Sequence, residues 1–288
     1  MMSTPRFLLI RAGTDRGQVL FWAILILVLT VAALVVVFPF VWMIFTSLKF
    51  EKDVFSYPPR LLPSEWTLQN YTDIWNRLPM DLFFRNSLIF AGGVTLVSLF
   101  LDSLAAYAFS RLDFPGRDTV FIFVLVALML PFQVTFIPLY VTVQSLGMLN
   151  SFAGLIIPRA TNAFGIFMLR QFFNGIPREL DDAARIDGAG EFYIYSRIIL
   201  PLSGPALATL TIFHFMYNWN DFLWPILITK TTEMRTLPAG LALFMGEHVI
   251  ENALLMAGTT LALLPLFVAF LFAQKYFVRS IVMSGLKE

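Results

Sequence analysis

Six long runs of apolar residues divide this chain, and shorter polar segments separate them. A helix needs about 20 apolar residues to cross about 30 Å of hydrocarbon. The pattern therefore predicts an all-α, polytopic membrane protein with six spans. The fourth run is the weakest, because Pro158, Arg159, Thr161 and Asn162 interrupt it. The predicted spans are residues 19–48, 86–109, 119–143, 151–172, 204–229 and 251–276.

Lysine and arginine gather in alternate connections, and such residues mark the cytoplasmic side. The connection between the third and fourth spans has no basic residue, whereas the one between the fourth and fifth has three, and Arg170 at the end of the fourth span makes a fourth. The first run is too long for a secretory signal, and no small-residue cleavage site follows it. We therefore expect residues 1–18 and 277–288 to be cytoplasmic segments that flank a membrane domain at residues 19–276.

Composition supports the membrane class and excludes several others. Hydrophobic residues make up 58% of the chain and charged residues 14%, and mean hydropathy is +0.76, which is typical of neither globular nor disordered proteins. A net charge of +1 gives no basic field for nucleic acid. Without cysteine, the soft metal ligands are His214 and His248, and His248 beside Glu247 does not make a metal motif. We expect no metal site.

A charged, alanine-rich segment at residues 174–201 lies between the fourth and fifth spans, on the predicted cytoplasmic side. Its acidic residues favour a helix start near Asn174 and Pro177, because the positive end of the helix dipole attracts negative charge. Gly188 then fits a left-handed C-terminal cap. A helix over 177–187 is about 16 Å long, too short to span a bilayer or to be stable alone.

A second short helix is predicted from Gly190 to Leu200, with a bend at Pro201 and Pro205 into the fifth span. The two short helices form an elbow with a small-residue surface, suited to seating in a cleft of a partner. Its predicted contact residues are Asp182, Ala183, Ala184, Arg185, Asp187, Gly188, Ala189, Leu200 and Pro201. The alternative is an ordinary amphipathic connector at the lipid interface.

The spacing from Asp182-Ala183-Ala184 through Gly188 to Ile198, Leu200 and Pro201 resembles the Glu-Ala-Ala loop of bacterial ABC importer permeases. Asp182 stands where that family usually has glutamate, and its shorter side chain alters that contact. Three further segments resemble the carbohydrate-uptake branch, in particular its maltose-type second permease. They are residues 111–116, 165–173 and 219–225.

The resemblance implies an ABC importer permease fold with cytoplasmic coupling helices, in the cytoplasmic (inner) membrane. It also implies a non-catalytic subunit that translocates an oligosaccharide, polyol or sugar phosphate. ATP and Mg²⁺ would be bound by a partner, since the chain has no Gly-x-x-x-x-Gly-Lys-Ser/Thr loop. The implied partners are a second permease, two ATP-binding subunits, an extracytoplasmic solute-binding protein and membrane lipid.

Ionisable residues inside spans are costly and normally face a partner or a cavity. Asp102 and Arg159 lie at similar predicted depths, so one interpretation pairs them across helices. The alternative places Arg159 at a broken helix, where it pairs with backbone carbonyls.

The fifth span carries a polar stripe of His214, Asn218 and Asp221 on one helical face, with Tyr217 and Trp224 at its margin. Aromatic faces with amide and carboxylate groups suit a sugar pathway, but the same stripe fits interhelical contacts with a second permease. Trp219 and Phe222 are expected to pack or to lie in an interfacial aromatic belt.

The outer loop over residues 230–250 offers Pro238, Ala239 and Gly240 either as a finger toward the binding protein or as a plain connector. Two rival functions remain. A secondary transporter would show symmetry between its halves, and none is detectable. A membrane enzyme would need a convergent set of catalytic groups, and none stands out.

Overall fold

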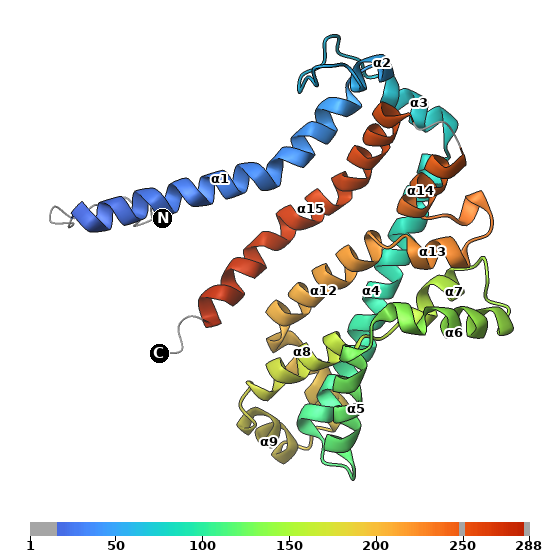
Figure 1. The fold of residues 1–288 in the computed structure, drawn as a ribbon. Coiled ribbons are helices and arrows are strands. Elements are labelled where there is room, and N and C mark those ends of the chain that lie inside the picture. The colour runs from blue at the N-terminus through green and yellow to red at the C-terminus, as the bar shows by residue number, and fades with distance from the viewer. Residues whose placement is uncertain (1–15, 248–250, 285–288) are drawn as a thin grey trace.

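The computed structural model describes residues 16–247 and 251–284, and every regular element in them is a helix (Figure 1). Three helices are long and apolar enough to cross a membrane, or up to six spans result if each bent pair counts as one. The long helices are α1 (Arg16–Ser47), α4 (Met80–Arg111) and α15 (Asn252–Ser284). The all-α prediction is confirmed.

The third predicted span is not one continuous helix. It consists of α5 (Arg117–Met129) and α6 (Phe132–Ser145), which meet at an angle of 102°. Pro131 precedes α6 and has no backbone N–H, and a proline drives the residue before it into extended backbone. Leu130 is extended accordingly, so the third predicted span is a bent pair of helices and not one straight helix.

The fourth span breaks where its polar residues predicted. Helices α7 (Phe152–Ile156) and η2 (Ile157–Arg159) are followed, after a 46° bend, by α8 (Ala163–Asn174). Asn162 caps α8, since its side chain accepts the backbone N–H of Phe164 at 2.8 Å. The break brings polar backbone and Arg159 into the interior of the molecule.

The fifth predicted span, residues 204–229, also divides. Helix α12 (Gly204–Trp219) ends at Trp219, and a separate helix α13 (Leu223–Ile228) follows. The short helices α9 (Glu179–Ile186), α10 (Glu191–Ile194), η3 (Tyr195–Ile199) and α11 (Leu200–Leu202) lead into α12. The segment Glu191–Leu202 meets α12 at 80°, so the predicted bend near Pro201 and Pro205 is confirmed.

Helix α4 runs the length of the molecule and contributes to three apolar clusters. At one end it packs on α8, η3 and α12 through Tyr107. At the other end Phe83 packs among α3 (Gln69–Arg77), α14 (Leu237–Glu247) and α15. The third cluster joins α4 to α6, α7 and α13 around Trp224. Helix α2 (Glu51–Val54) and η4 (Thr232–Met234) complete the fold.

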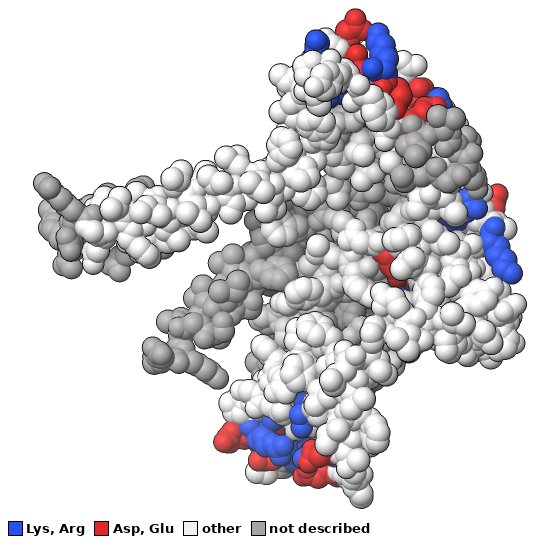
Figure 2. Space-filling model, viewed as in Figure 1, with Lys and Arg blue, Asp and Glu red and all other residues white. Residues whose placement is uncertain are grey.

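Charge is concentrated at the two ends of the molecule, as Figure 2 shows. The broad middle band is almost free of charged side chains, and α1, which extends away from the other helices in Figure 1, is apolar along its exposed length. Such an apolar belt between two charged ends is suited to a hydrocarbon surrounding. One charged end carries α9, and the other carries α2 and α3. A few charged side chains also lie on one flank, level with α13 and α14.

Candidate functional site: a helical elbow and a charge-paired centre

Helix α9 forms the first arm of the elbow and begins at Glu179, two residues later than predicted. Asn174 does not cap it, because Asn174 is the last residue of α8. Glu179, Asp181 and Asp182 occupy its first turn, where the helix dipole favours negative charge. The acidic start is therefore confirmed, while the predicted cap is wrong.

Gly188 ends α9 in the conformation that the sequence predicted. Its φ is +83°, a left-handed value that glycine adopts without steric cost. Gly188 N–H donates to the carbonyl of Arg185 at 3.0 Å, and Ala189 N–H donates to the carbonyl of Ala184 at 2.9 Å. These two bonds form a Schellman motif, which satisfies the last carbonyls of the helix and turns the chain sharply.

Asp181 fastens α9 to the end of α4. Its carboxylate lies 3.2 Å from Nε of Arg111, and the two side chains are 2% and 1% exposed. Arg111 also donates from Nη2 to the carbonyls of Phe173 and Ile176, both at 2.8 Å. Burial raises the pKa of the Asp181 carboxyl, and the positive charge of Arg111 opposes that rise. A buried ion pair thus anchors the elbow to α4.

Arg185 joins the two arms of the elbow across the glycine turn. It contacts Asp182 on its own helix at 3.1 Å and Glu191 on α10 at 2.9 Å. The hydrogen bond with Glu191 raises the pKa of Arg185. Glu191 also accepts the hydroxyl of Tyr107, on α4, at 2.6 Å. The second arm is therefore held to α4 as well.

The outer face of the elbow combines exposed apolar side chains, small residues and charged side chains such as Asp182 and Asp187. Ile186 is 86% exposed, and Phe192 and Tyr193 are also exposed. A surface hollow lies between the arms, and its floor and walls include Ala183, Ala184, Asp187, Gly188, Ala189 and Gly190. Leu200 packs on the core cluster behind the hollow, and Pro201 begins the turn into α12. This face can accept a complementary partner surface.

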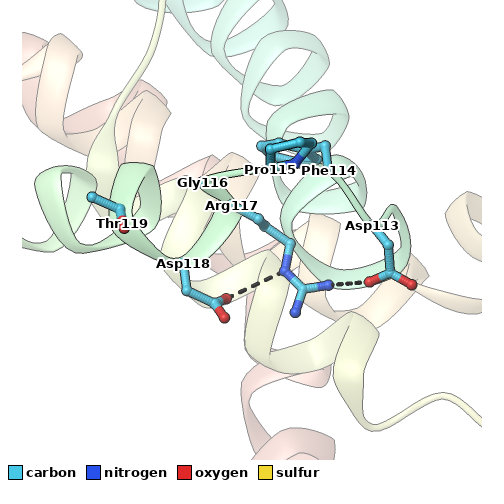
Figure 3. A pocket seen from close by; sticks show the side chains of 7 residues that line it. All are labelled: Asp113, Phe114, Pro115, Gly116, Arg117, Asp118 and Thr119. Carbon is cyan, nitrogen blue, oxygen red and sulfur yellow. Dashed lines mark hydrogen bonds and ion pairs between the residues drawn. The ribbon is translucent and has the colours of Figure 1, made fainter.

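The α4–α5 connection forms a second charged feature at the same end of the molecule (Figure 3). Arg117 lies between Asp113 at 2.7 Å and Asp118 at 3.2 Å. Gly116 has a left-handed φ of +81° that permits the tight turn. Arg170 of α8 stacks on Phe121, with its guanidinium 3.8 Å from the ring centre. These contacts fix α5 beside α8.

A second polar cluster lies in the middle of the molecule, around Asp102 of α4. Its Oδ1 accepts the hydroxyl of Thr161 at 2.7 Å and the backbone N–H of Asn162 at 3.0 Å. Its Oδ2 lies 3.3 Å from Nε2 of His214 on α12. A side chain at Gly165 would collide with this carboxylate. Asp102 therefore ties the break in the fourth span to α12.

Arg159 pairs with the end of α12 and not with Asp102. Its Nη1 lies 3.1 Å from Oδ2 of Asp221, and its Nε donates to Oδ1 of Asn218 at 3.1 Å. The predicted Asp102–Arg159 pair is thus wrong. The alternative correctly placed Arg159 at a broken helix but gave it the wrong partners, because the interruption of α12 brings Asp221 within reach.

Arg159 is also enclosed by aromatic rings. Its guanidinium lies 4.6 Å from the ring centre of Phe132 and 5.2 Å from that of Tyr217, at cation–π distance. The predicted stripe is wrong for Asp221, which lies beyond the end of α12. His214 and Asn218 are on α12, buried and paired within this chain. Tyr217 is 57% exposed, and with Asn220 and Asp221 it lines a surface hollow among apolar side chains.

The two tryptophans of the predicted fifth span differ in part from expectation. Trp219 is buried and donates to the carbonyl of Ala262 at 3.1 Å, as predicted for a packing residue. Trp224 is fully buried and donates to the carbonyl of Leu155 at 3.2 Å. It thus faces the core, not a pathway, because α13 folds back onto α6 and α7.

Pro238, Ala239 and Gly240 do not form a protruding finger. They belong to the first turns of α14, where Ala239 is fully buried and Gly240 packs directly on Phe83 of α4. Apolar contact with α4 outweighs the turn tendency of the Pro-Ala-Gly sequence. Among residues 230–244, whose exposure the structure describes, the exposed ones are Lys230, Thr231, Thr232 and Glu233. His248 lies outside the described residues.

The sequence did not single out Asp181, Arg111, Tyr107 or Glu191 as members of the elbow. Asp181 and Asp182 are adjacent identical residues, so composition alone cannot say which one faces inward. Helical spacing gives one usable signal, because Arg111 and Tyr107 lie four residues apart on α4 and share a face. Arg111 at the end of an apolar run otherwise looks like a residue that reaches for the interface.

These features define the class of protein. They are a multi-span helical fold, an exposed elbow at one charged end, and broken spans around the separate ion pairs of Asp102 and Arg159. The chain belongs to the family of binding-protein-dependent transport system inner membrane components, whose model matches residues 98–283.

Relatives match the chain over most of their length. The probable ABC transporter permease protein YurM of Bacillus subtilis is 35% identical over 94% of this chain and 89% of its own. The arabinooligosaccharides transport system permease protein AraQ of Halalkalibacterium halodurans is 34% identical over 88% and 92%. The sn-glycerol-3-phosphate transport system permease protein UgpE of Yersinia pestis is 37% identical over 90% and 95%.

A solved structure has the same fold. A chain of a bacterial ABC transporter involved in the import of the acidic polysaccharide alginate superimposes with a TM-score of 0.83. It shares 23% identity, and the match covers 93% of this chain and 100% of that chain. The permease fold expected from the sequence is therefore confirmed.

Proposed function

We propose that this chain is the permease subunit of an ATP-driven carbohydrate importer and that both its termini face the cytoplasm. A separate ATPase subunit docks on the elbow of α9 and α10. ATP and Mg²⁺ bind to that ATPase subunit and not to this chain. The observation that carries this proposal is the geometry of α9: a two-turn helix, closed by Gly188, anchored at its base and exposed on its outer face, where apolar Ile186 lies beside charged side chains. A helix so short is only marginally stable alone in water and needs packing against other surfaces.

The mechanism follows from where the elbow is attached. Closure of two ATPase subunits displaces α9, and the displacement rocks the spans of this chain against those of a second permease. Such rigid-body switching between two states is a common mode of coupling. A solute-binding protein delivers the solute at the other end, as the family description indicates.

The solute class is proposed from the named relatives and from the hollow beside α12. The relatives act on arabinooligosaccharides and on sn-glycerol-3-phosphate, which are both rich in hydroxyl groups. Tyr217 offers an aromatic face, and Asn220 and Asp221 offer hydrogen-bonding groups. Asn218 lies behind this surface and, together with Asp221, holds Arg159. His214 lies one turn earlier, and its carbonyl accepts a hydrogen bond from the Asn218 side chain at 2.8 Å.

The test is uptake by the complete transporter in liposomes. The chain is assembled with the second permease, ATPase and binding protein of its own system and supplied with a panel of labelled oligosaccharides, polyols and sugar phosphates. ATP-dependent uptake of at least one member is expected, while amino acids and metal ions are not transported. Uptake that needs an ion gradient instead of ATP would support a secondary transporter and refute the proposal.

A further inference from the structure

Two neighbouring carboxylates of α9 face opposite ways. Asp182 is exposed and pairs with Arg185, which is itself partly exposed. Asp181 is buried against Arg111, where water does not reach the pair. An exposed pair re-forms easily with other partners, since water and salt weaken it. A buried pair does not, because separating it leaves an uncompensated charge in the interior.

We propose that the Arg111–Asp181 pair is the joint through which the elbow moves α4, so that α9 and α4 travel as one rigid body during transport. Arg111 and Asp181 are then positioning residues and do not contact the solute. This inference rests on the proposed function, and it adds which helix receives the displacement.

The contacts of Arg111 explain why one pair suffices to fix α9. Its guanidinium holds Asp181 and also the carbonyls of Phe173 and Ile176, which lie at the end of α8 and in the α8–α9 connection. The end of α8, the connection and α9 are therefore held by one side chain of α4. Arg178 adds a bond from Nη2 to the carbonyl of Ser110 at 3.1 Å.

The same face of α4 continues toward the polar cluster around Asp102. Tyr107 holds Glu191, and Ser103 lies 2.8 Å from the hydroxyl of Tyr195 on η3. The next residue, Asp102, holds the break in the fourth span and His214. Arg111 and Asp102 are nine residues apart, about 14 Å along a helix. A displacement of α9 is thus delivered to the broken spans through a continuous helix.

The natural chain contains no cysteine, which permits a direct distance measurement. Spin labels are attached to Glu179→Cys on α9 and Phe100→Cys on an exposed position of α4, within the liposome-reconstituted transporter. The distance is measured without nucleotide and with a non-hydrolysable ATP analogue. We expect one narrow distance that is the same in both states.

Asp181→Asn should then separate transmission from docking. In this variant the ATPase subunits still co-purify, the labelled distance broadens or shifts with nucleotide, and sugar uptake per ATP falls at least tenfold. Asp181→Glu, which keeps the charge, should recover part of the coupling. Glu65→Gln removes an exposed carboxylate between α2 and α3, outside the elbow and its contacts, and should match the unmodified transporter in every measurement.

Unchanged uptake and an unchanged distance in Asp181→Asn would overturn the proposal, and so would loss of the ATPase subunits, because Asp181 would then act in docking. If Asp181→Asn does not assemble, Arg111→Lys replaces it. A lysine keeps the charge but has no guanidinium to hold the carboxylate and both carbonyls, so a broadened distance with reduced coupling is expected, and values of the unmodified transporter would refute the joint. An unmodified transporter that binds no ATPase would refute the proposed function itself.

Discussion

Individual residues decide the shape of the elbow through their backbone preferences and their charges. Gly188 illustrates the first, because its left-handed φ follows from the lack of a side chain and not from its surroundings. No atom outside its immediate chain neighbours lies within 4 Å of the position that a Cβ would occupy. A substitution there therefore tests backbone strain alone.

Replacing Gly188 with valine should uncouple the transporter. A β-branched residue at this φ costs about 1–2 kcal/mol and favours loss of the Schellman turn. We expect uptake to fall about tenfold, while the amount of protein in the membrane stays normal. Gly188→Asn is the matched control, since asparagine tolerates left-handed backbone and should retain most of the uptake. Normal uptake by Gly188→Val would contradict the importance of the turn.

The Arg159–Asp221 pair should be strongly coupled energetically. Asp221→Asn leaves the charge of Arg159 buried without its partner, which typically costs about 3–5 kcal/mol. The double variant Arg159→Gln, Asp221→Asn should lose less than the sum of the two single variants, by about 0.5–3 kcal/mol. Thermal unfolding of the purified protein in detergent measures all three. Additive losses would show that the two side chains act independently.

At the scale of elements, the N-terminus of α15 is held by a carboxylate from another part of the chain. Glu51 of α2 accepts the backbone N–H groups of Asn252 and Ala253, both at 2.8 Å. These are donors that a helix leaves unpaired at its start. Arg77 and Glu251 form an ion pair nearby at 2.8 Å, but both side chains are exposed.

The two contacts should therefore differ in strength. Glu51→Ala removes charge-assisted hydrogen bonds and should lower the unfolding free energy by about 1.5–3 kcal/mol. Arg77→Ala should cost at most about 1 kcal/mol, because water screens an exposed pair. Thermal unfolding in detergent at two salt concentrations ranks them, and only the Arg77 contribution should weaken with salt. The opposite ranking would contradict this account of α15.

The existence of the long helices could be predicted from the sequence, but not all of their breaks. Apolar composition shows that a segment prefers hydrocarbon. Because the composition is the same on both sides of a bend, it cannot show where the bend lies. Pro131 carried a usable signal, because proline restricts the residue before it. The end of α12 at Trp219 carried none, since Asp221 looks like one more member of the polar stripe of a longer helix.

Features of the site that depend on residues close in the sequence could be predicted, and features that depend on distant residues could not. Gly188 and the acidic start of α9 depend on neighbouring residues, and both are confirmed. The pairing of Asp102 and Arg159 depends on how broken helices turn relative to one another, and there the sequence was misleading. Burial of Ala239 and Gly240 likewise depends on Phe83, which is distant in the sequence.

At the scale of the whole molecule, the two charged ends and the apolar band between them describe a protein that joins two aqueous compartments (Figure 2). Helix α4 connects those ends, since its contacts run from Asp181 at one end to η4 toward the other, where Asn86 donates to the carbonyl of Glu233 at 2.6 Å. A continuous helix between the elbow and the opposite side of the membrane is what the proposed joint requires.

Site-specific cross-linking from the elbow tests this account most directly. A photoreactive residue replaces Ile186, which is 86% exposed on α9, in cells that produce the whole transport system. Tyr57, which is 96% exposed beyond α2 at the opposite end, serves as the matched control. We predict that position 186 captures an ATP-hydrolysing subunit and is labelled from the cytoplasmic side, whereas position 57 does neither. Capture of no such subunit from position 186, or labelling of that position from outside, would contradict the account.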